Sequence, residues 1–212
     1  ESSKRSRRKG AATFPLMPET LESENDMFLI PHFARNWMLD ANSSYGVSVY
    51  GNGGMNTFYK PGLNPNGIFN GAAAGGAANA GVNLEQLFVN ISYAQKMAAK
   101  SSWGISAILA YQKFKSDGLA AFGAFSSDNT KLTDNGHDDS TGLGVKLGWQ
   151  GEVSPGLTLA ASYQSEIGMS EFDSYAGLFA EQGDFDIPAS WTLGLAMDMG
   201  SSATLTFDVQ NI

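Results

Sequence analysis

The feature that most constrains the fold of this chain is a two-residue alternation of its side chains. In WGISAILAYQKF (103–114), the odd-numbered side chains are apolar until the last, and the even-numbered ones are, apart from Ile108, small or polar until Phe114. Because successive side chains of a strand point to opposite faces, this stretch predicts a β-strand with two different faces. In a soluble sandwich the apolar face would meet a core. In a membrane barrel it would meet lipid, and the small polar face would line the interior.

The same alternation recurs along the chain and predicts eight strands. These are 27–39, 44–51, 84–98, 102–114, 142–153, 157–167, 188–199 and 203–212. Their connections alternate between short turns and three long loops, at about 52–83, 115–140 and 168–187. In an up-and-down sheet, alternate connections lie at opposite ends, as in outer-membrane barrels. The fold class predicted is therefore all-β, a transmembrane antiparallel up-and-down β-barrel with long extracellular loops.

Composition and aromatic positions favour lipid on the apolar face. Only 16% of the residues are charged, against about 25% in a soluble domain. No run approaches the roughly 20 apolar residues of a membrane-spanning helix, so strands would have to make the crossing. Two aromatic belts suit two membrane–water interfaces. We predict one near the short turns, formed by Trp37, Tyr45, Trp103 and Trp149, and one toward the long loops, formed by Tyr93, Tyr111, Tyr163 and Trp191.

Charge divides the chain into two parts. Residues 1–26 contain a basic cluster, KRSRRK, and are interpreted as a basic, irregular N-terminal segment. Residues 27–212 are interpreted as part of the barrel, with the three long loops. The net charge of −8 leaves this second part strongly acidic, which argues against nucleic acid as a partner. The chain contains no Cys, which excludes disulfides and thiol chemistry.

The long loops carry more apolar side chains than solvated loops need. They either pack on each other as a cap or form a groove for an apolar ligand, and the two interpretations are compatible. The candidate ligand-binding residues in the loops are Phe58, Phe69, Leu119, Phe122, Phe125, Leu178, Phe179 and Phe185. Lys96 and Lys146 are added because they fall on the expected inner face. They either join Glu166 and Asp198 in ion pairs or hold a ligand carboxylate.

No catalytic residue set and no metal site is predicted. HDDS (137–140) contains His, Asp and Ser, but neighbours in sequence do not form a catalytic triad by adjacency. The acids at Asp128, Asp134, Asp138 and Asp139 match no EF-hand spacing. GNGG (51–54) lacks the strand–helix context of a phosphate-binding loop and is interpreted as a bend out of the wall.

Several stretches resemble the FadL-type outer-membrane transporters of long-chain fatty acids and hydrocarbons. They are YGNGGMNTFY (50–59), LEQLFVNISYAQK (84–96), ILAYQKFKSDGLAAFGAFS (108–126) and MSEFDSYAGLFAEQGDFDIPASWTLGLA (169–196). The resemblance implies a barrel of about fourteen strands with an N-terminal plug. It also implies capture of ligand by extracellular loops, transfer to a lumen site and exit through a lateral opening, without any cofactor.

The chain departs from this family in two respects. Residues 1–26 do not resemble the plug, and eight strands would close a barrel with little lumen. We therefore expect a partial chain or a shortened relative. The leading functional hypothesis is passive uptake of long-chain fatty acids or other hydrophobic compounds across the bacterial outer membrane, with the bilayer as the surrounding partner. The alternatives are a structural barrel subunit that contacts other envelope proteins and, ranked lower, an outer-membrane lipid hydrolase.

Overall fold

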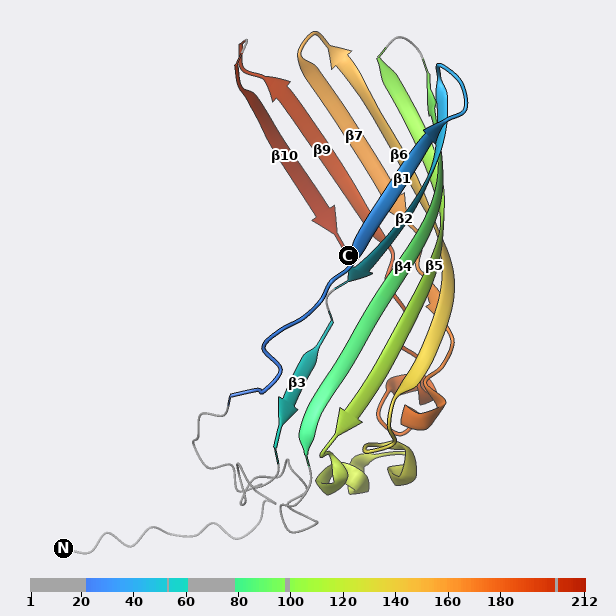
Figure 1. Ribbon diagram of the computed structural model, residues 1–212, viewed down its shortest axis with the longest axis vertical. Coiled ribbons are helices and arrows are strands. Elements are labelled where there is room, and N and C mark those ends of the chain that lie inside the picture. Colours follow the sequence, from blue (N-terminus) through green and yellow to red (C-terminus); the bar gives the residue numbers. More distant parts are fainter. Residues whose placement is uncertain (1–21, 53, 61–78, 98–99, 201) are drawn as a thin grey trace, which may run out of the picture.

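The computed structural model describes residues 22–52, 54–60, 79–97, 100–200 and 202–212 (Figure 1). The strands are β1 (His32–Met38), β2 (Ser43–Asn52), β3 (Asn56–Tyr59), β4 (Ala80–Lys96), β5 (Ser101–Asp117), β6 (Asp138–Ser154), β7 (Leu157–Gln164), β8 (Gly168–Met169), β9 (Ser190–Asp198) and β10 (Thr204–Asn211). Short 3₁₀ helices are η2 (Ala120–Phe125), η3 (Asn129–Lys131), η4 (Asp173–Tyr175) and η5 (Ala180–Gln182). No helix in these ranges is long and apolar enough to cross a membrane.

All ten strands belong to one antiparallel sheet with up-and-down connections. The order is β1-β2-β4-β5-β6-β7-β9-β10, with β3 beside β4 and β8 beside β6. Short turns lie at one end, the top of Figure 1, and the long loops lie at the other. This confirms the predicted architecture. The sheet curves but does not close, because within the described residues β1 pairs with β2 alone and β10 with β9 alone.

Several strand ends differ from those predicted from the sequence. β4, β5 and β6 are 17 residues each, so they extend beyond the predicted ranges toward the long loops. In β5 and β6 polar residues hid the strand ends, since outside an apolar layer they can still join a ladder. In β4 the added residues are Ala80, Gly81, Val82 and Asn83, which show no clear alternation. The first strand begins at His32 rather than at residue 27, after Pro31, which has no N–H to donate. The predicted strand 157–167 ends at Gln164.

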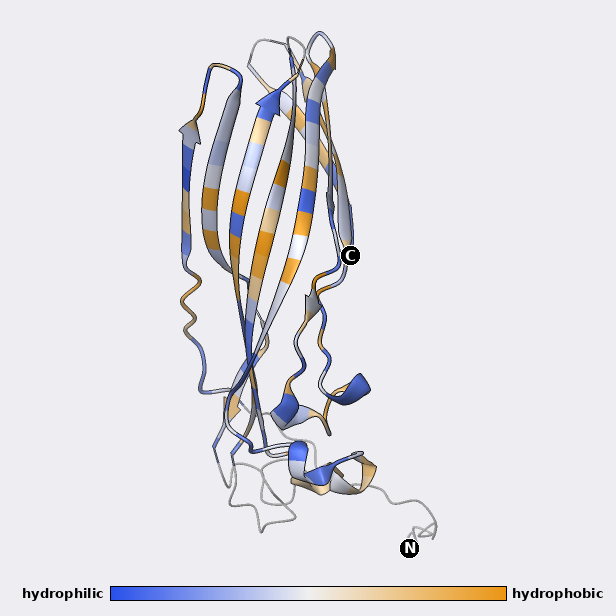
Figure 2. Ribbon diagram, turned by 90° about the vertical axis from the view of Figure 1, so that its right-hand side faces the viewer, coloured by the Kyte–Doolittle hydropathy of each residue, from blue (hydrophilic) through white to orange (hydrophobic). Residues whose placement is uncertain are grey.

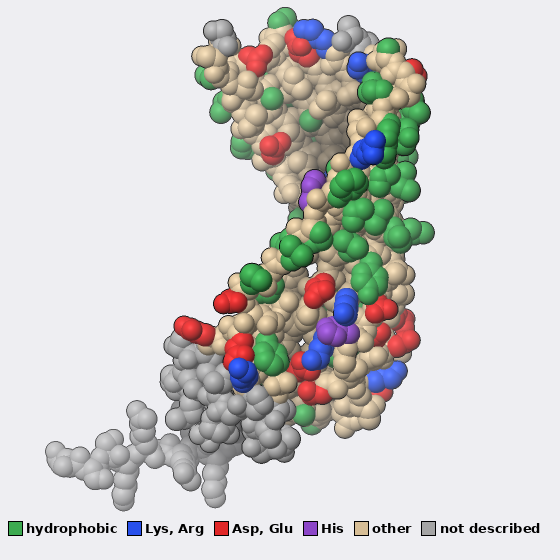
Figure 3. Space-filling view, in the orientation of Figure 1, with side chains coloured by type: hydrophobic (Ala, Val, Ile, Leu, Met, Phe, Trp, Pro, Cys, Tyr) green, Lys and Arg blue, Asp and Glu red, His purple; other side chains and the backbone are tan. Residues whose placement is uncertain are grey.

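The large apolar side chains lie on the exposed face of the sheet. Leu109 on β5 is 46% exposed, whereas its neighbours Ile108 and Ala110 are 1% and 0% exposed. Figure 2 shows the alternation of hydropathy along the strands. Figure 3 shows hydrophobic side chains gathered in a band over the middle of the sheet, with charged ones toward its ends. This is the opposite of a soluble sheet, which turns its apolar face to a core.

Aromatic side chains near the short turns form one belt on that exposed face. Trp37 stacks on Tyr45 with ring centroids 4.9 Å apart, and Trp103 lies opposite Trp149 in the register. Tyr93 was predicted to lie toward the long loops, and this is wrong. Its ring packs edge-on against Trp103 at 6.0 Å, because β4 ends only three residues later, at Lys96.

The core lies between the concave face of the sheet and the chain that follows β7. After β7, the side chain and amide of Ser165 both bond to the backbone of Val145, at 3.1 and 2.9 Å. Ile167 then forms a β-bridge with Ile187, so residues 168–187 become a closed loop that folds back over β4–β6. A first apolar cluster under this loop consists of Phe88, Ile108, Ala110, Ile167 and Met169.

Candidate functional site

The two long loops 118–137 and 168–187 are connected by hydrogen bonds and form one cap at the end of the sheet. The hydroxyl of Tyr175 accepts a hydrogen bond from the Ser116 amide at 3.1 Å and donates one to the Gly136 carbonyl at 2.5 Å. Burial raises the pKa of this Tyr175 hydroxyl, so it remains a neutral donor. The amide of Ser174 donates to the carboxylate of Asp138 at 2.7 Å. The cap is therefore held by the strand ends themselves.

Gly177 marks the closest approach of the two loops. Its amide donates to the Lys131 carbonyl at 3.0 Å, and its carbonyl accepts from the Ser126 hydroxyl at 2.7 Å. A Cβ at this position would lie 1.9 Å from the carbonyl oxygen of Asp128, far inside contact distance. Only glycine therefore permits this backbone contact.

A cluster of aromatic rings lies beneath the cap and is called here the aromatic cluster. It consists of Phe114, Phe172, Tyr175, Phe179 and Phe185. Neighbouring ring centroids are 4.9–5.7 Å apart, the range of favourable aromatic pairs. Phe114, like Ile108, is a large apolar residue on the otherwise small, polar face of the strand 103–114, and it meets three of these rings. The inner face of the sheet thus becomes apolar where the loop rests on it.

An apolar cavity opens beside the aromatic cluster and is called here the loop pocket. Its volume is about 530 Å³. It is lined by Met55, Thr57, Tyr59, Ala80, Gly81, Val82, Phe114, Ser116, Asp117, Leu119, Leu178 and Phe179. Four separate parts of the chain therefore build it. They are β3 with the residue before it, the start of β4, the end of β5 with the residues that follow it, and the chain just before η5.

A close backbone approach places β3 on one wall of this pocket. β2 ends at Asn52 and β3 begins at Asn56, and both pair with β4. The ladder is interrupted between them at the predicted bend. A Cβ on Gly54 would lie 1.9 Å from the Leu84 carbonyl oxygen, so this position too requires glycine. The bend lets the chain rejoin β4 with Thr57 and Tyr59 toward the pocket.

Three of the loop residues predicted as ligand contacts line the loop pocket, namely Leu119, Leu178 and Phe179. Phe185 lies behind it, with its ring 5.2 Å from that of Phe179. The other predicted loop residues are placed elsewhere. Phe58 is half-buried on β3 between two lining residues, Phe122 is half-buried in η2, Phe125 is 78% exposed, and Phe69 lies outside the described residues.

Some residues of the site were missed by the sequence analysis. Met55, Tyr59 and Val82 line the pocket, and Phe172 and Tyr175 support it from the aromatic cluster. Phe114 carried a signal, because it and Ile108 are the large apolar members of a set that is otherwise small and polar. The others could be found only from the packing of distant segments.

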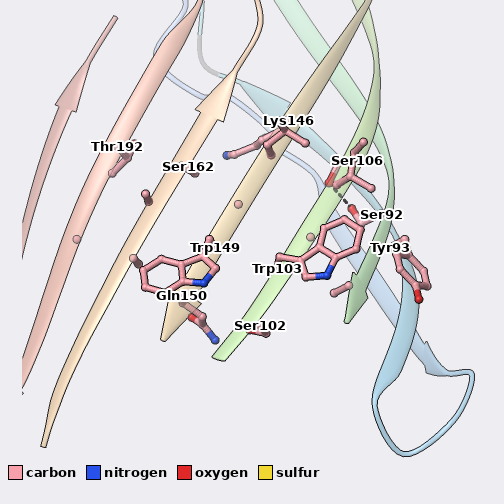
Figure 4. Close-up of a pocket in the computed structure, with 18 of the residues that line it drawn as sticks. Ser92, Tyr93, Ser102, Trp103, Ser106, Lys146, Trp149, Gln150, Ser162 and Thr192 are labelled. Carbon is pink, nitrogen blue, oxygen red and sulfur yellow. Dashed lines mark hydrogen bonds between the residues drawn. The ribbon is translucent and has the colours of Figure 1, made fainter. Parts of the chain in front are cut away.

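The two predicted lysines lie apart from the loop pocket. Lys96 is at the short-turn end of β4, where its amine donates to the Ala41 carbonyl at 3.0 Å. Lys146 lines a separate open hollow of about 410 Å³, among small side chains that include Ser106, Ser162 and Thr192 (Figure 4). Over the described residues, neither lysine forms an ion pair with Glu166 or Asp198.

The polar residues of HDDS serve to anchor the loops. The Ser140 hydroxyl donates to the Ser170 carbonyl, and Asp138 holds the amide of Ser174. The side chain of His137 is largely exposed. Partial desolvation, and then the positive charges of Lys113 and Lys115, lower the pKa of His137. Ser140 and Asp138 therefore bond to the backbone of the 168–187 loop, whereas a hydrolase would need them to bond to a catalytic histidine. Within the described residues, no three His, Asp or Glu side chains group as a metal site.

Solved structures with a similar fold include two toluene transporters and a FadL homologue. No protein-family model and no curated protein matches the sequence. The toluene transporter TodX of Pseudomonas putida is 18% identical, with a TM-score of 0.66, over 86% of this chain and 54% of that one. The toluene transporter TbuX of Ralstonia pickettii is 18% identical, with a TM-score of 0.62, over 85% and 53%. A FadL homologue of Pseudomonas aeruginosa is 16% identical, with a TM-score of 0.60, over 85% and 48%.

These matches confirm the predicted resemblance to FadL-type transporters at the level of the fold. The chain spans about half the length of the structures it matches, which agrees with the open edges of its sheet.

Proposed function

We propose that this chain forms part of an outer-membrane β-barrel for passive uptake of hydrophobic compounds, and that the loop pocket captures the ligand. The observation that carries the proposal is the position of the pocket. It is an apolar cavity at the long-loop end of a sheet whose exposed face is also apolar. Such a cavity fits the hydrocarbon part of a hydrophobic compound, whether an alkyl chain or an aromatic ring.

The exposed face supports a place in the bilayer. Its large apolar side chains would be a liability in water, and the belt of Trp and Tyr near the short turns suits a membrane interface. Within a bilayer the unpaired edges of β1 and β10 must hydrogen-bond to further strands. We assign these strands to a longer form of the chain or to a partner protein of the envelope.

The loop pocket supports capture because its volume and lining suit an alkyl or aryl group. A cavity of about 530 Å³ falls within the usual range of about 300–1,000 Å³ for small-molecule sites. The toluene transporters that share this fold favour the same class of ligand. Movement down a gradient needs no cofactor.

The test measures ligand binding at the pocket itself. Because the chain has no Cys, Ala180→Cys gives a single thiol beside Phe179 for an environment-sensitive dye. The labelled protein in lipid nanodiscs is titrated with 1-dodecanol, against labelled Leu119→Ala and Phe125→Ala. Leu119 lines the pocket and Phe125 does not, so we expect about fivefold weaker binding for Leu119→Ala alone. Equal affinity in all three proteins would refute capture at this pocket.

A further inference from the structure

We infer that the loop pocket selects uncharged apolar compounds and excludes carboxylates, a conclusion that rests on the proposed function. The ligand class follows from the charges around the cavity. Of the described residues that line it, none is Lys, Arg or His, and the one carboxylate is Asp117. The other polar side chains of the lining are the hydroxyls of Thr57, Tyr59 and Ser116, which are neutral.

Two of the lysines that adjoin the lining residues in the sequence, Lys60 and Lys115, form ion pairs with acidic side chains. The amine of Lys115 lies 2.8 Å from the carboxylate of Asp117, and the amine of Lys60 lies 2.7 Å from that of Glu24. Lys113 lies on the exposed face, opposite Glu85 in the register. The sequence of residues 61–78, which follows β3, contains no charged residue. The described surroundings therefore offer a ligand anion no cation of its own.

A carboxylate would enter such a cavity at a large disadvantage. It would lose its water shell and find hydroxyl groups but no compensating positive charge. The carboxylate of Asp117 at the wall is already paired with Lys115, so this pair offers the ligand no net positive charge. A neutral hydroxyl loses far less on leaving water and can hydrogen-bond to Thr57 or Ser116. Selection against the anion thus takes place at capture, before a ligand reaches Lys146 on the inner face.

The first experiment compares two ligands that differ only in their end group. The labelled Ala180→Cys protein in nanodiscs is titrated at about pH 8 with 1-dodecanol or with dodecanoate, which is fully ionised there. Dissociation constants are calculated from the concentration of free ligand in water. Titrations of empty nanodiscs correct for ligand that partitions into lipid. We expect dodecanol to bind at least about tenfold more tightly than dodecanoate. Equal affinities would overturn the selection and leave capture at the pocket standing.

The second experiment places a cation in the pocket and controls for the loss of the leucine. Leu119→Lys is compared with Leu119→Gln, which has similar length and no charge. We expect dodecanoate to bind about tenfold more tightly to the Lys variant than to the Gln variant, and dodecanol to bind both alike. Equal binding of dodecanoate to the two variants would show that missing positive charge does not exclude it. If neither ligand changes the dye signal of the parent protein, the proposed capture fails, and the selection with it.

Discussion

Phe172→Ala should detach the 168–187 loop from the sheet. The Phe172 side chain is 0% exposed, and its ring lies 5.6 Å from that of Phe114 and 5.7 Å from that of Phe179. The backbone of the same residue is part of the loop, since its amide donates to the Gly183 carbonyl at 2.8 Å. Removal of this ring leaves a cavity between the loop and the inner face of β5.

The expected magnitude follows from core truncations. Replacing a buried Phe by Ala costs about 3–5 kcal/mol. The ladders between β4, β5 and β6 do not depend on this ring, so the cost falls on local opening of the loop. Each 1.4 kcal/mol changes an opening equilibrium about tenfold, so about 3 kcal/mol lowers protection of the loop amides by roughly 100-fold.

Hydrogen exchange followed by mass spectrometry measures this protection peptide by peptide. Peptides from 168–187 should lose protection, whereas those from the middle of β5 should keep theirs. Phe125→Ala is the matched control, because the same side chain is removed from a position that is 78% exposed. Less than about tenfold loss in the loop, or an equal loss in β5, would refute the view that the aromatic cluster fixes the cap.

Three further predictions concern the cap. Tyr175→Phe leaves the amide that bonds to its hydroxyl without a partner, so thermal unfolding monitored by near-ultraviolet circular dichroism should show a loss of about 1–3 kcal/mol. Gly177→Ala should separate the two loops and expose both to protease, whereas Gly148→Ala, whose Cβ would meet nothing within 4 Å, should be digested like the parent. Hydrogen bonds from Thr130 lower the pKa of Asp128 below its ordinary value of 3.8. The depressed pKa means that the Asp128 contribution is complete above 3.8 and is lost as the pH falls through the lower, folded-state value. An NMR titration should therefore show η3 loosening only in strong acid, and Asp128→Asn should remove that pH dependence.

Much of the architecture could be predicted because strands carry their own pattern. The alternation in 103–114 requires only that neighbouring side chains point to opposite faces. Turn residues between the strands then gave the up-and-down order. The prediction was wrong for the ends of strands such as β5 and β6, where polar residues continue the ladder. It was also wrong for Tyr93, which lies near the short turns because β4 ends three residues after it.

The site was predicted only in part, because its residues meet across long separations in the sequence. Leu119 and Phe179 both line the loop pocket, yet nothing near either one in the sequence indicates the other. Phe125 has the same apolar character as Phe179 and is nevertheless exposed. Lys146 lies on the expected face but outside the pocket.

The sequence by itself determined the eight longer strands, their directions and which face of each is apolar, since a two-residue period is a local property of the backbone. It did not indicate the short strands β3 and β8, which lie within predicted loops. Only the tertiary structure decided where the long loops rest. Tyr175 reaches Ser116, 59 residues earlier in the chain, and the aromatic cluster assembles from β5 and the 168–187 loop. Such contacts depend on packing between distant segments, which no local period encodes, and they alone create the apolar pocket without a cation.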